Sequence, residues 1–397
     1  MKKLNNNFIP YGCQEINQSD IDYVIEVLKS PNLTQGPTVT KFENAISNKV
    51  NSKYAIAVNS ATSALHLACL SLSLKEGDLL WTSPTSFVAS ANCALYCGAK
   101  VDFVDIDPKT GLISINNLEK KLYKANKEKK LPKILLVVHL AGTSCDMKSI
   151  KVLSEKYGFL IIEDASHALG GKYFEDYVGS CRYSSITVFS FHPVKIITTG
   201  EGGCLTTNDI EIAKRIFDLR SHGIVKDSKR FVNKQSEPWI YEQQELGFNY
   251  RMTDIQAALG ISQLKRLDEF VRKRNKILNI YKKLVEDLPL YFLEIPPNIY
   301  SSVHLAVINL KSPNRDLHLA IFNELRSKNI GVQIHYIPIH LQPYYRNLGF
   351  KRGDFPNAEI YALNAISLPI YPNLDEEIPK KVVKLIENVI NNFGDNK

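Results

Sequence analysis

The stretch ITVFSFHPVKIITTGEGG, residues 186–203, decides the fold around it. Its apolar start predicts a buried β-strand, and its glycine-rich end predicts a tight turn that reverses the chain. Lys195 lies between the two. Removal from water lowers the pKa of a lysine amine, and such an amine can attack a carbonyl group to form a Schiff base. The alternative is that Lys195 simply faces solvent, as one of 49 lysines and arginines.

The composition is that of a soluble globular protein, with 44% hydrophobic and 23% charged residues. A length of 397 residues allows a large core and two domains. The 49 basic and 41 acidic residues give a net charge of +8, but the cations are scattered. Their densest run, residues 120–133, indicates a helix end and a solvated loop. A nucleic-acid site needs a coherent basic stripe with interleaved aromatic residues, so we expect no nucleic-acid partner.

The targeting and cysteine patterns favour the cytoplasm. The amino terminus, MKKLNNNFIP, has no apolar segment of the kind that a signal peptide carries, and no apolar run approaches a membrane span. The seven cysteines are an odd number without a C-x-x-C pair, which fits a reducing compartment. We therefore expect a cytoplasmic protein that has no membrane contact and no metal site.

Strands and helices alternate along the first half of the chain. Strands are predicted at residues 54–58, 78–82, 100–104, 133–139 and 158–163, and helices at residues 19–29, 39–50, 64–72, 86–97, 114–125, 146–157 and 210–220. Such alternation predicts an α/β fold with a mostly parallel, doubly wound sheet and helices on both faces. Residues 223–247 are rich in charged residues and glutamines, and we expect them to form a long functional loop.

The second part of the chain predicts a smaller α/β domain. A long helix should begin at Thr253 and run past Arg274 as the connection. Strands are expected at residues 303–310 and 331–336, and helices at residues 316–327 and 375–392. We therefore predict a large domain with an amino-terminal covering segment over residues 1–255. Residues 256–397 should form the connecting helix and the small domain.

Candidate ligand-binding groups lie where the predicted strands end, which is where doubly wound sheets bind ligands. Asp164 can keep a heterocyclic nitrogen protonated, or it can cap a helix. The hydroxyl-rich run at residues 60–63 opens a helix and can bind an anion, or it can serve as an ordinary cap. Phe87 can stack on a flat ring, or it can belong to the core. Together with Lys195, these are the parts of a pyridoxal phosphate site.

The chain resembles the sugar-nucleotide aminotransferases of the DegT/DnrJ/EryC1/StrS family, a branch of the fold-type-I aminotransferases. The matching stretches keep the family's order: NSATSALHLA, TSPTSFVASANC, IIEDASHALGG, VFSFHPVKIITTGEGG, LRSHG, GFNYRMTDIQAALGISQL and VQIHYIPIH. The resemblance implies a seven-stranded sheet, pyridoxal 5'-phosphate as cofactor, and a homodimer with shared active sites.

The resemblance also implies a role for individual residues. Lys195 would carry the cofactor as a Schiff base, and Asp164 would pair with the pyridinium nitrogen. His167 would contact the side of the ring that bears the hydroxyl, although many members have glutamine there. The remaining cofactor contacts would be phosphate binding by Ala61, Thr62 and Ser190, ring stacking by Phe87, and a contact from Asn249 to the phosphate in the neighbouring subunit.

Several features favour a particular branch of the family. The opening IPYG, the turn NLTQG, the pair SHALGG and SFHPVK, and the late IHYIPIH are similar to members that serve pseudaminic acid biosynthesis. Those members move an amino group from L-glutamate to the C4 ketone of a UDP-linked 4-keto-6-deoxy-N-acetylhexosamine. The alternatives are another ketosugar or a dTDP nucleotide, because sister enzymes share most of these motifs.

The substrate is expected to meet residues outside the cofactor motifs. Tyr11 and Thr34 precede the predicted sheet and can cover the mouth of the site, or they can merely pack against the first helix. A basic loop, residues 222–234, could neutralise a nucleotide diphosphate. Further substrate contacts are expected from His192, Arg251, His335 and Tyr336.

Two other functions remain open. A non-catalytic protein of the same fold would not need Lys195 together with Asp164. A sugar dehydratase of this fold has histidine in place of the lysine, and His192 lies three residues too early for that substitution.

Overall fold

The computed structural model describes residues 8–233 and 237–395. Its centre is a seven-stranded sheet in the order β1-β9-β8-β5-β4-β2-β3, in which β9 is antiparallel to both neighbours and the other pairs are parallel. This confirms the predicted mostly parallel, doubly wound sheet. The strands are β1 (Tyr54–Val58), β2 (Leu79–Thr82), β3 (Lys100–Phe103), β4 (Ile134–Val138), β5 (Leu160–Asp164), β8 (Ile186–Ser190) and β9 (Gly203–Thr207).

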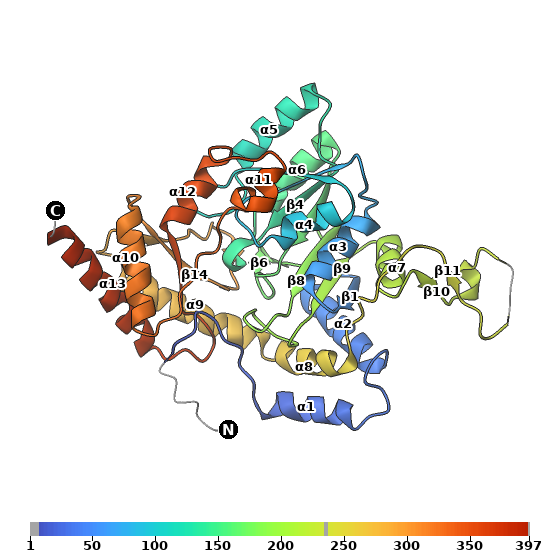
Figure 1. The fold of residues 1–397 in the computed structure, drawn as a ribbon. Coiled ribbons are helices and arrows are strands. Elements are labelled where there is room, and N and C mark those ends of the chain that lie inside the picture. The colour runs from blue at the N-terminus through green and yellow to red at the C-terminus, as the bar shows by residue number, and fades with distance from the viewer. Residues whose placement is uncertain (1–7, 234–236, 396–397) are drawn as a thin grey trace.

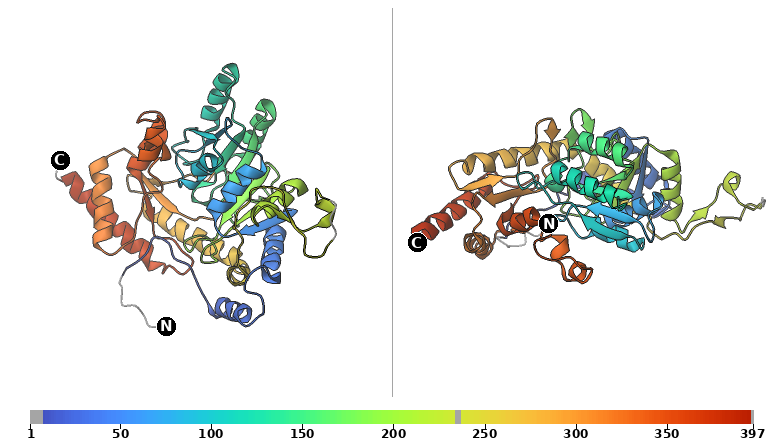
Figure 2. Two further views of the ribbon diagram at one scale, coloured as in Figure 1. Left: turned by 45° about the vertical axis from the view of Figure 1, so that its right-hand side comes forward. Right: turned by 90° about the horizontal axis from the view of Figure 1, so that it is seen from above.

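Helices cover both faces of this sheet (Figures 1 and 2). The pair α3 and α4 lies on one face and the pair α5 and α6 on the other, as right-handed crossovers require. The helices of this part are α2 (Pro37–Val50), α3 (Ala61–Ser71), α4 (Ala89–Tyr96), α5 (Ile115–Lys127), α6 (Met147–Tyr157) and α7 (Ile210–Leu219).

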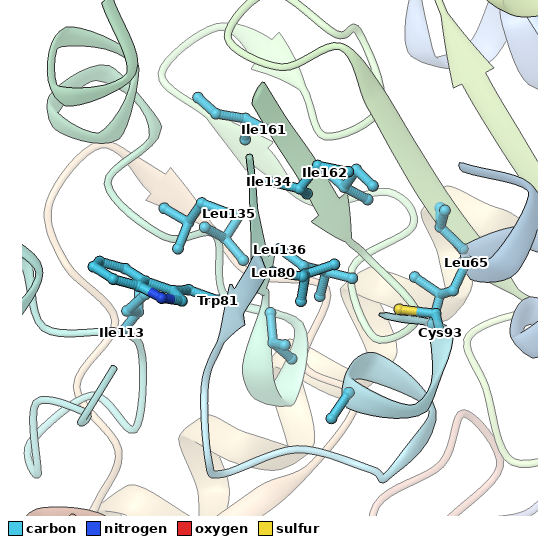
Figure 3. Packing of buried hydrophobic residues seen from close by; sticks show 14 of the residues in the cluster. Leu65, Leu80, Trp81, Cys93, Ile113, Ile134, Leu135, Leu136, Ile161 and Ile162 are labelled. Carbon is cyan, nitrogen blue, oxygen red and sulfur yellow. The ribbon is translucent and has the colours of Figure 1, made fainter. Parts of the chain in front are cut away.

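The core forms where the central strands meet these helices. β4 is buried along its whole length, because it has a strand on each side and helices above and below. Figure 3 shows Leu135 and Leu136 of β4 packed with Ile161 and Ile162 of β5. Each buried aliphatic side chain of this kind contributes about 1.5–3 kcal/mol. The rigid strands therefore fix the positions of the loops at their carboxyl ends.

A second cluster of buried apolar residues lies in the carboxyl-terminal part. A small antiparallel sheet, β12-β14-β15, packs there with α9, α10 and α13. The elements of this part are α8 (Asp254–Leu264), α9 (Leu267–Leu284), β12 (Leu290–Phe292), β14 (Ala306–Leu310), α10 (Arg315–Ser327), α11 (Pro343–Asn347), α12 (Pro356–Asn364), β15 (Ala365–Leu368) and α13 (Glu377–Asp395). The domain boundary at residues 255–256 stays a prediction.

Three expected elements differ from the structure. The long connecting helix is two helices: the backbone of Arg266 leaves helical geometry between them, and its guanidinium binds Glu15 and Asp20. Residues 331–336 form no strand; Gln333 makes a single bridge to Ser367, and the partner strand of β14 is β15 instead. The helix expected at residues 86–97 begins only at Ala89, so that Phe87 precedes it.

The amino-terminal segment crosses from one part of the molecule to the other. The Ile370 N–H donates to the Tyr11 carbonyl (3.0 Å), and Ile9 pairs with Ile330. Helix α1 (Gln18–Leu28) then packs against α8. Its cap is Asn17, which forms a reciprocal capping box with Asp20.

The expected loop at residues 223–247 contains a short hairpin that projects from the body (Figures 1 and 2). Its strands are β10 (Ile224–Val225) and β11 (Glu242–Gln243). A small sheet of β6 (Lys172–Tyr173), β7 (Asp176–Tyr177) and β13 (Ile299–Tyr300), and 3-10 turns at Leu140–Gly142, Ser228–Arg230 and Ile339–Leu341, complete the fold. Within the described ranges, no helix is both long and apolar enough to cross a membrane.

Candidate active site

A cavity of about 430 Å³ opens at the carboxyl ends of the central strands. All but three of the predicted site residues line it: Tyr11, Ala61, Thr62, Phe87, Asp164, His167, Ser190, His192, Lys195, His335 and Tyr336. They come from the amino-terminal segment, four strand ends of the large sheet and the loop after residue 331. The fold thus brings together residues that are more than 300 positions apart in the sequence.

Thr34, Asn249 and Arg251 lie outside this cavity. Thr34 is exposed and bridges to Thr253, and Asn249 is exposed and bridges to Ser221. Arg251 is half-buried beside β1, where its backbone bridges to Val58. Their expected roles remain predictions.

Lys195 is held in the turn that follows β8. Its N–H donates to the His192 carbonyl (2.8 Å), while Thr199 donates to the Phe191 carbonyl (3.0 Å) and closes the turn. Burial lowers the pKa of the Lys195 amine to about 8, although the charge of Asp164 acts in the opposite direction. Within residues 8–233 and 237–395, the amine has no hydrogen bond or ion pair. It is therefore available to react with a carbonyl group.

Asp164 ends β5 and presents a carboxylate to the cavity. One oxygen accepts from the Ser90 hydroxyl (2.6 Å), and the other accepts from the Ser166 hydroxyl (2.6 Å) and N–H (3.1 Å). These donors fix the orientation of the carboxylate. Sequence reasoning missed Ser90, because nothing near it in the sequence indicates that α4 packs beside β5.

The start of α3 forms an anion site. Ser60 caps the helix by accepting from the Ser63 N–H (3.1 Å), and its carbonyl takes the Ala64 N–H. The N–H groups of Ala61 and Thr62 have no partner in the described part of the chain, and both residues line the cavity. Free N–H groups at a helix start bind phosphate well.

A glycine is required beside this helix start. A side chain at Gly203 would place its Cβ atom 2.6 Å from the backbone nitrogen of Ala61. Only glycine lets β9 approach so closely, which explains the last glycine of the quoted turn. Ser190, at the end of the neighbouring strand β8, also lines the cavity and adds a hydroxyl.

Aromatic rings surround the opposite side of the cavity. The Tyr336 hydroxyl lies 3.3 Å from Nε2 of His167, and the Tyr11 ring lies 5.2 Å from that of His335. Burial lowers the pKa of His335 to about 3 and lowers that of His167 well below its usual range; the charge of Lys195 adds to both effects. Both imidazoles are therefore neutral. Phe87 is 58% exposed and its ring lies 6.5 Å from that of Tyr336, so it is not part of the core.

These groups fit one cofactor. A reactive amine, a fixed carboxylate and a helix start with free N–H groups are what a pyridoxal phosphate enzyme requires. The Lys195 amine and the N–H groups of Ala61 and Thr62 have no protein partner in the described part of the chain and line the cavity, so they are free to bind such a ligand. The fold and site therefore define a protein of this class.

Comparison of the whole sequence with known proteins leads to the same class of protein. Residues 14–387 match the DegT/DnrJ/EryC1/StrS aminotransferase family. The UDP-4-amino-4,6-dideoxy-N-acetyl-beta-L-altrosamine transaminase of Campylobacter jejuni (serotype O:2) is 40% identical over 384 residues, with 96% of each chain covered. GDP-perosamine synthase of Escherichia coli O157:H7 is 33% identical and covers 98% of this chain and 99% of its own.

Solved structures give the same result. Helicobacter pylori PseC, an aminotransferase involved in the biosynthesis of pseudoaminic acid, superimposes with a TM-score of 0.87 at 32% identity, covering 96% of this chain and 99% of its own. The PLP form of the putative sugar aminotransferase Spr1654 from Streptococcus pneumoniae has a TM-score of 0.85 at 26% identity, covering 96% and 98%. The chain belongs to the DegT/DnrJ/EryC1/StrS aminotransferase family and is a pyridoxal phosphate-dependent sugar aminotransferase.

Proposed function

We propose that the chain transfers the amino group of L-glutamate to the C4 ketone of a UDP-linked 4-keto-6-deoxy-N-acetylhexosamine. The products would be UDP-4-amino-4,6-dideoxy-N-acetyl-beta-L-altrosamine and 2-oxoglutarate, in pseudaminic acid biosynthesis. The observation that carries the proposal is the 40% identity to the altrosamine transaminase over nearly the whole of both chains. The seven cysteines are all free, which supports a reducing cytoplasm as the place of the reaction.

Each polar group of the cavity has a proposed task. When bound, pyridoxal phosphate supplies an electrophilic carbon and an electron-accepting ring. Lys195 would hold it covalently through Nζ, and this amine, when free, would accept the proton from the α-carbon of the amino donor. Asp164 keeps the ring nitrogen protonated by its charge.

The remaining cofactor contacts position the ring and its phosphate. The N–H groups of Ala61 and Thr62 and the Ser190 hydroxyl bind the phosphate. Phe87 stacks on the ring, and His167 contacts the ring oxygen.

Four of the proposed sugar contacts line the cavity: Tyr11, His192, His335 and Tyr336. Tyr11 offers a ring and a hydroxyl beside His335 and Tyr336, and His192 lines the cavity next to the cofactor lysine. Thr34 lies on a turn that Asp254 clamps by accepting from the N–H groups of Gly36 and Thr38 (2.8 Å each). If these residues bind the sugar, Tyr11→Phe and Thr34→Ala should slow the half-reaction with the ketosugar and leave that with glutamate unchanged.

We also propose a homodimer with shared sites. Asn249 and Arg251 do not line the cavity of their own chain, and the projecting hairpin carries Lys226 and Lys229 exposed. Arg230 is already paired with Asp218, so it is a weaker candidate for the diphosphate than these two lysines. Mixing Asn249→Ala with Lys195→Ala subunits should restore part of the activity in a shared dimer. Light scattering measures the mass of the active protein, and the mass of a fully active monomer would contradict the dimer.

One assay decides the substrate. The protein is incubated with L-glutamate and a panel of UDP-, dTDP- and GDP-linked 4-ketosugars, and each product is identified by mass spectrometry and NMR. We expect the UDP-linked N-acetylhexosamine to be aminated with the highest kcat/KM. The similarity to the perosamine synthase makes a GDP-linked 4-ketosugar the second candidate, and its preference in the panel would overturn the first.

A further inference from the structure

Glu201 also lines the cavity and belongs to the glycine-rich turn of residues 200–203. It is the only residue of this turn that has a side chain. The residue is exposed, and its carboxylate has no hydrogen bond or ion pair in the described part of the chain. Asp164, the other carboxylate of the described cavity lining, is by contrast held by Ser90 and Ser166. The cavity therefore has one acidic group that is free to bind a ligand.

The backbone of Glu201 is fixed although its carboxylate is free. Its carbonyl accepts from the Thr199 hydroxyl (2.8 Å) and from Nε2 of Gln256 (2.7 Å). A side chain at Gly202 would place its Cβ atom 2.2 Å from Oγ1 of Thr199 and 2.7 Å from the side chain of Met252. Because Gly202 has no side chain, the turn can lie against these two residues. The turn therefore holds the backbone of Glu201 at a defined point of the cavity wall.

Gln256 connects this turn to the segment that carries Thr34, a predicted sugar-binding residue. The Oε1 atom of Gln256 accepts from the Thr253 N–H and from the Thr253 hydroxyl (2.9 Å each), and Thr253 forms a bridge with Thr34. A peptide N–H can only donate and a peptide carbonyl can only accept. The side-chain amide of Gln256 therefore has one orientation that satisfies both Thr253 and Glu201.

A free carboxylate discriminates among the ligands of the proposed reaction, because it accepts hydrogen bonds and repels anions. The cofactor phosphate, the nucleotide diphosphate and the carboxylates of L-glutamate are all anionic. The amino nitrogen of L-glutamate is occupied by its bond to the cofactor. The sugar ring of the ketosugar is neutral, and it offers hydroxyl and amide N–H donors. The sugar is therefore the ligand that suits this carboxylate.

We propose that Glu201 is a specificity-determining residue whose carboxylate accepts a hydrogen bond from a hydroxyl or amide N–H group of the ketosugar. Gln256 is the positioning residue that holds Glu201 for this contact. The inference rests on the proposed ketosugar substrate, and it adds which chemical groups of that substrate are recognised.

The first test compares the two half-reactions in Glu201→Ala and Glu201→Gln. Stopped-flow absorbance of the cofactor follows each half-reaction, with whichever nucleotide-linked 4-ketosugar the unaltered protein aminates. We expect Glu201→Ala to lower the rate constant with the ketosugar on the order of 10-fold to 100-fold, as for the loss of a hydrogen bond to a charged group. The half-reaction with glutamate should stay unchanged. Glu201→Gln keeps an acceptor oxygen and should lose less.

The outcomes separate this inference from the proposed function. A slowed half-reaction with glutamate, or an unchanged half-reaction with the ketosugar, would overturn the role of Glu201 and leave the aminotransferase reaction intact. If the unaltered protein prefers a GDP-linked ketosugar, the proposed substrate is wrong, and the same comparison on that sugar decides the role of Glu201.

The matched control is Glu175→Gln. Glu175 is also an exposed acid in a turn, between β6 and β7, but it does not line the cavity. This variant should leave both half-reactions unchanged. A loss equal to that of Glu201→Gln would show a general effect of net charge and would overturn the specific contact.

The second test separates positioning from helix stability. Gln256→Glu keeps an acceptor for the Thr253 N–H, and glutamate completes a capping box as glutamine does, but it cannot donate to the Glu201 carbonyl. We expect nearly unchanged thermal unfolding, a ketosugar half-reaction slowed by a few-fold, and an unchanged glutamate half-reaction. Gln256→Met loses both contacts and should lower stability as well. An unchanged ketosugar half-reaction in Gln256→Glu would contradict the positioning role.

Discussion

Two adjacent carboxylates on β5 have opposite surroundings. Asp164 faces the cavity and accepts hydrogen bonds from the hydroxyl groups of Ser90 and Ser166, whereas Glu163 points to the closed side of the sheet. Glu163 accepts from His139 (2.7 Å), from Thr187 (3.0 Å) on the neighbouring strand, and from Ser184. Because side chains alternate along a strand, one step in sequence moves a carboxylate from the reaction site into the core.

The difference shows how two acids of one strand serve activity and stability separately. Burial raises the pKa of Glu163, but the hydrogen bonds from His139, Ser184 and Thr187 outweigh it, and the pKa is lowered. His139 is itself fixed, because the Cys145 N–H donates to its Nδ1 atom (3.1 Å). We therefore expect changes on the cavity side to affect turnover, and changes at Glu163 to affect folding.

The largest effect is expected from Lys195→Ala. The variant should lose all turnover and the visible absorbance of the lysine-bound cofactor, because no other amine lies in the described cavity lining. Thermal unfolding should change little, since the amine has no hydrogen bond to lose. Lys156→Ala, at an exposed lysine, is the matched control. Any substantial turnover in Lys195→Ala would show that the lysine is misassigned.

Asp164→Asn should come next. An amide cannot hold the ring nitrogen in its charged form, so the half-reaction with glutamate should slow about 100-fold or more. The amide oxygen can still accept hydrogen bonds from Ser90 or Ser166, so the fold should persist. Stopped-flow absorbance measures the half-reaction, and circular dichroism checks the fold. A normal single-turnover rate in this variant would show that the Asp164 carboxylate is not needed to keep the ring nitrogen charged.

Glu163→Ala tests the closed side of the strand. It leaves His139, Ser184 and Thr187 without their acceptor, so the free energy of unfolding should fall by about 3 kcal/mol. Urea unfolding measures the loss, and the molecules that remain folded should keep the cofactor absorbance. The lowered pKa of Glu163 stabilises the fold at neutral pH, and this contribution should disappear as the pH falls through that pKa. If the folded molecules of this variant lost turnover, the closed side of β5 would also serve the reaction, and the two carboxylates would not have separate roles.

Cofactor uptake should depend on pH through the Lys195 amine. Only the unprotonated amine attacks a carbonyl, and its pKa lies near 8. The rate at which the cofactor-free protein binds pyridoxal phosphate should therefore rise about tenfold for each pH unit below 8 and level off above it. Stopped-flow absorbance follows the rate. A plateau reached only near pH 10, as for an exposed lysine, would show that the amine is not desolvated.

The smallest effect is expected from Ser90→Ala. It removes one hydrogen bond to Asp164, worth about 1 kcal/mol, while the two bonds from Ser166 remain. The half-reaction with glutamate should slow by a few-fold, with little change in stability. Ser71→Ala, whose buried hydroxyl bonds a helix carbonyl far from the cavity, is the control. An equal effect of both variants on the half-reaction would mean that Ser90 does not orient the carboxylate.

Much of the site could be predicted because its parts are local in sequence. Lys195 is placed by the strand and turn that flank it, and Ala61 and Thr62 by the helix that they open. Other parts depend on contacts between distant segments. Ser90 reaches Asp164 across 74 positions, and Tyr11 lies against His335 only because the amino-terminal segment crosses the molecule.

The errors have the same origin. Residues 331–336 have an apolar pattern that predicts a strand, but β15 occupies the place beside β14, and Gln333 makes a single bridge to Ser367 of β15. Arg266 stands at the break between α8 and α9, where two acids from the amino-terminal segment bind its side chain. The spacing of apolar residues in a sequence predicts helices and strands, but it does not predict which of these segments pack against each other.

The sequence by itself determined the alternating fold, the lysine and the helix start, since each depends on residues within one turn or strand. It also indicated Asp164 as the acid at the end of its strand, but it could not show that Ser90 donates to this carboxylate. The tertiary structure decided that, along with the place of Tyr11 against His335. Both depend on the packing of elements from distant parts of the chain, and a hydrogen bond acts only at the distance that such packing sets.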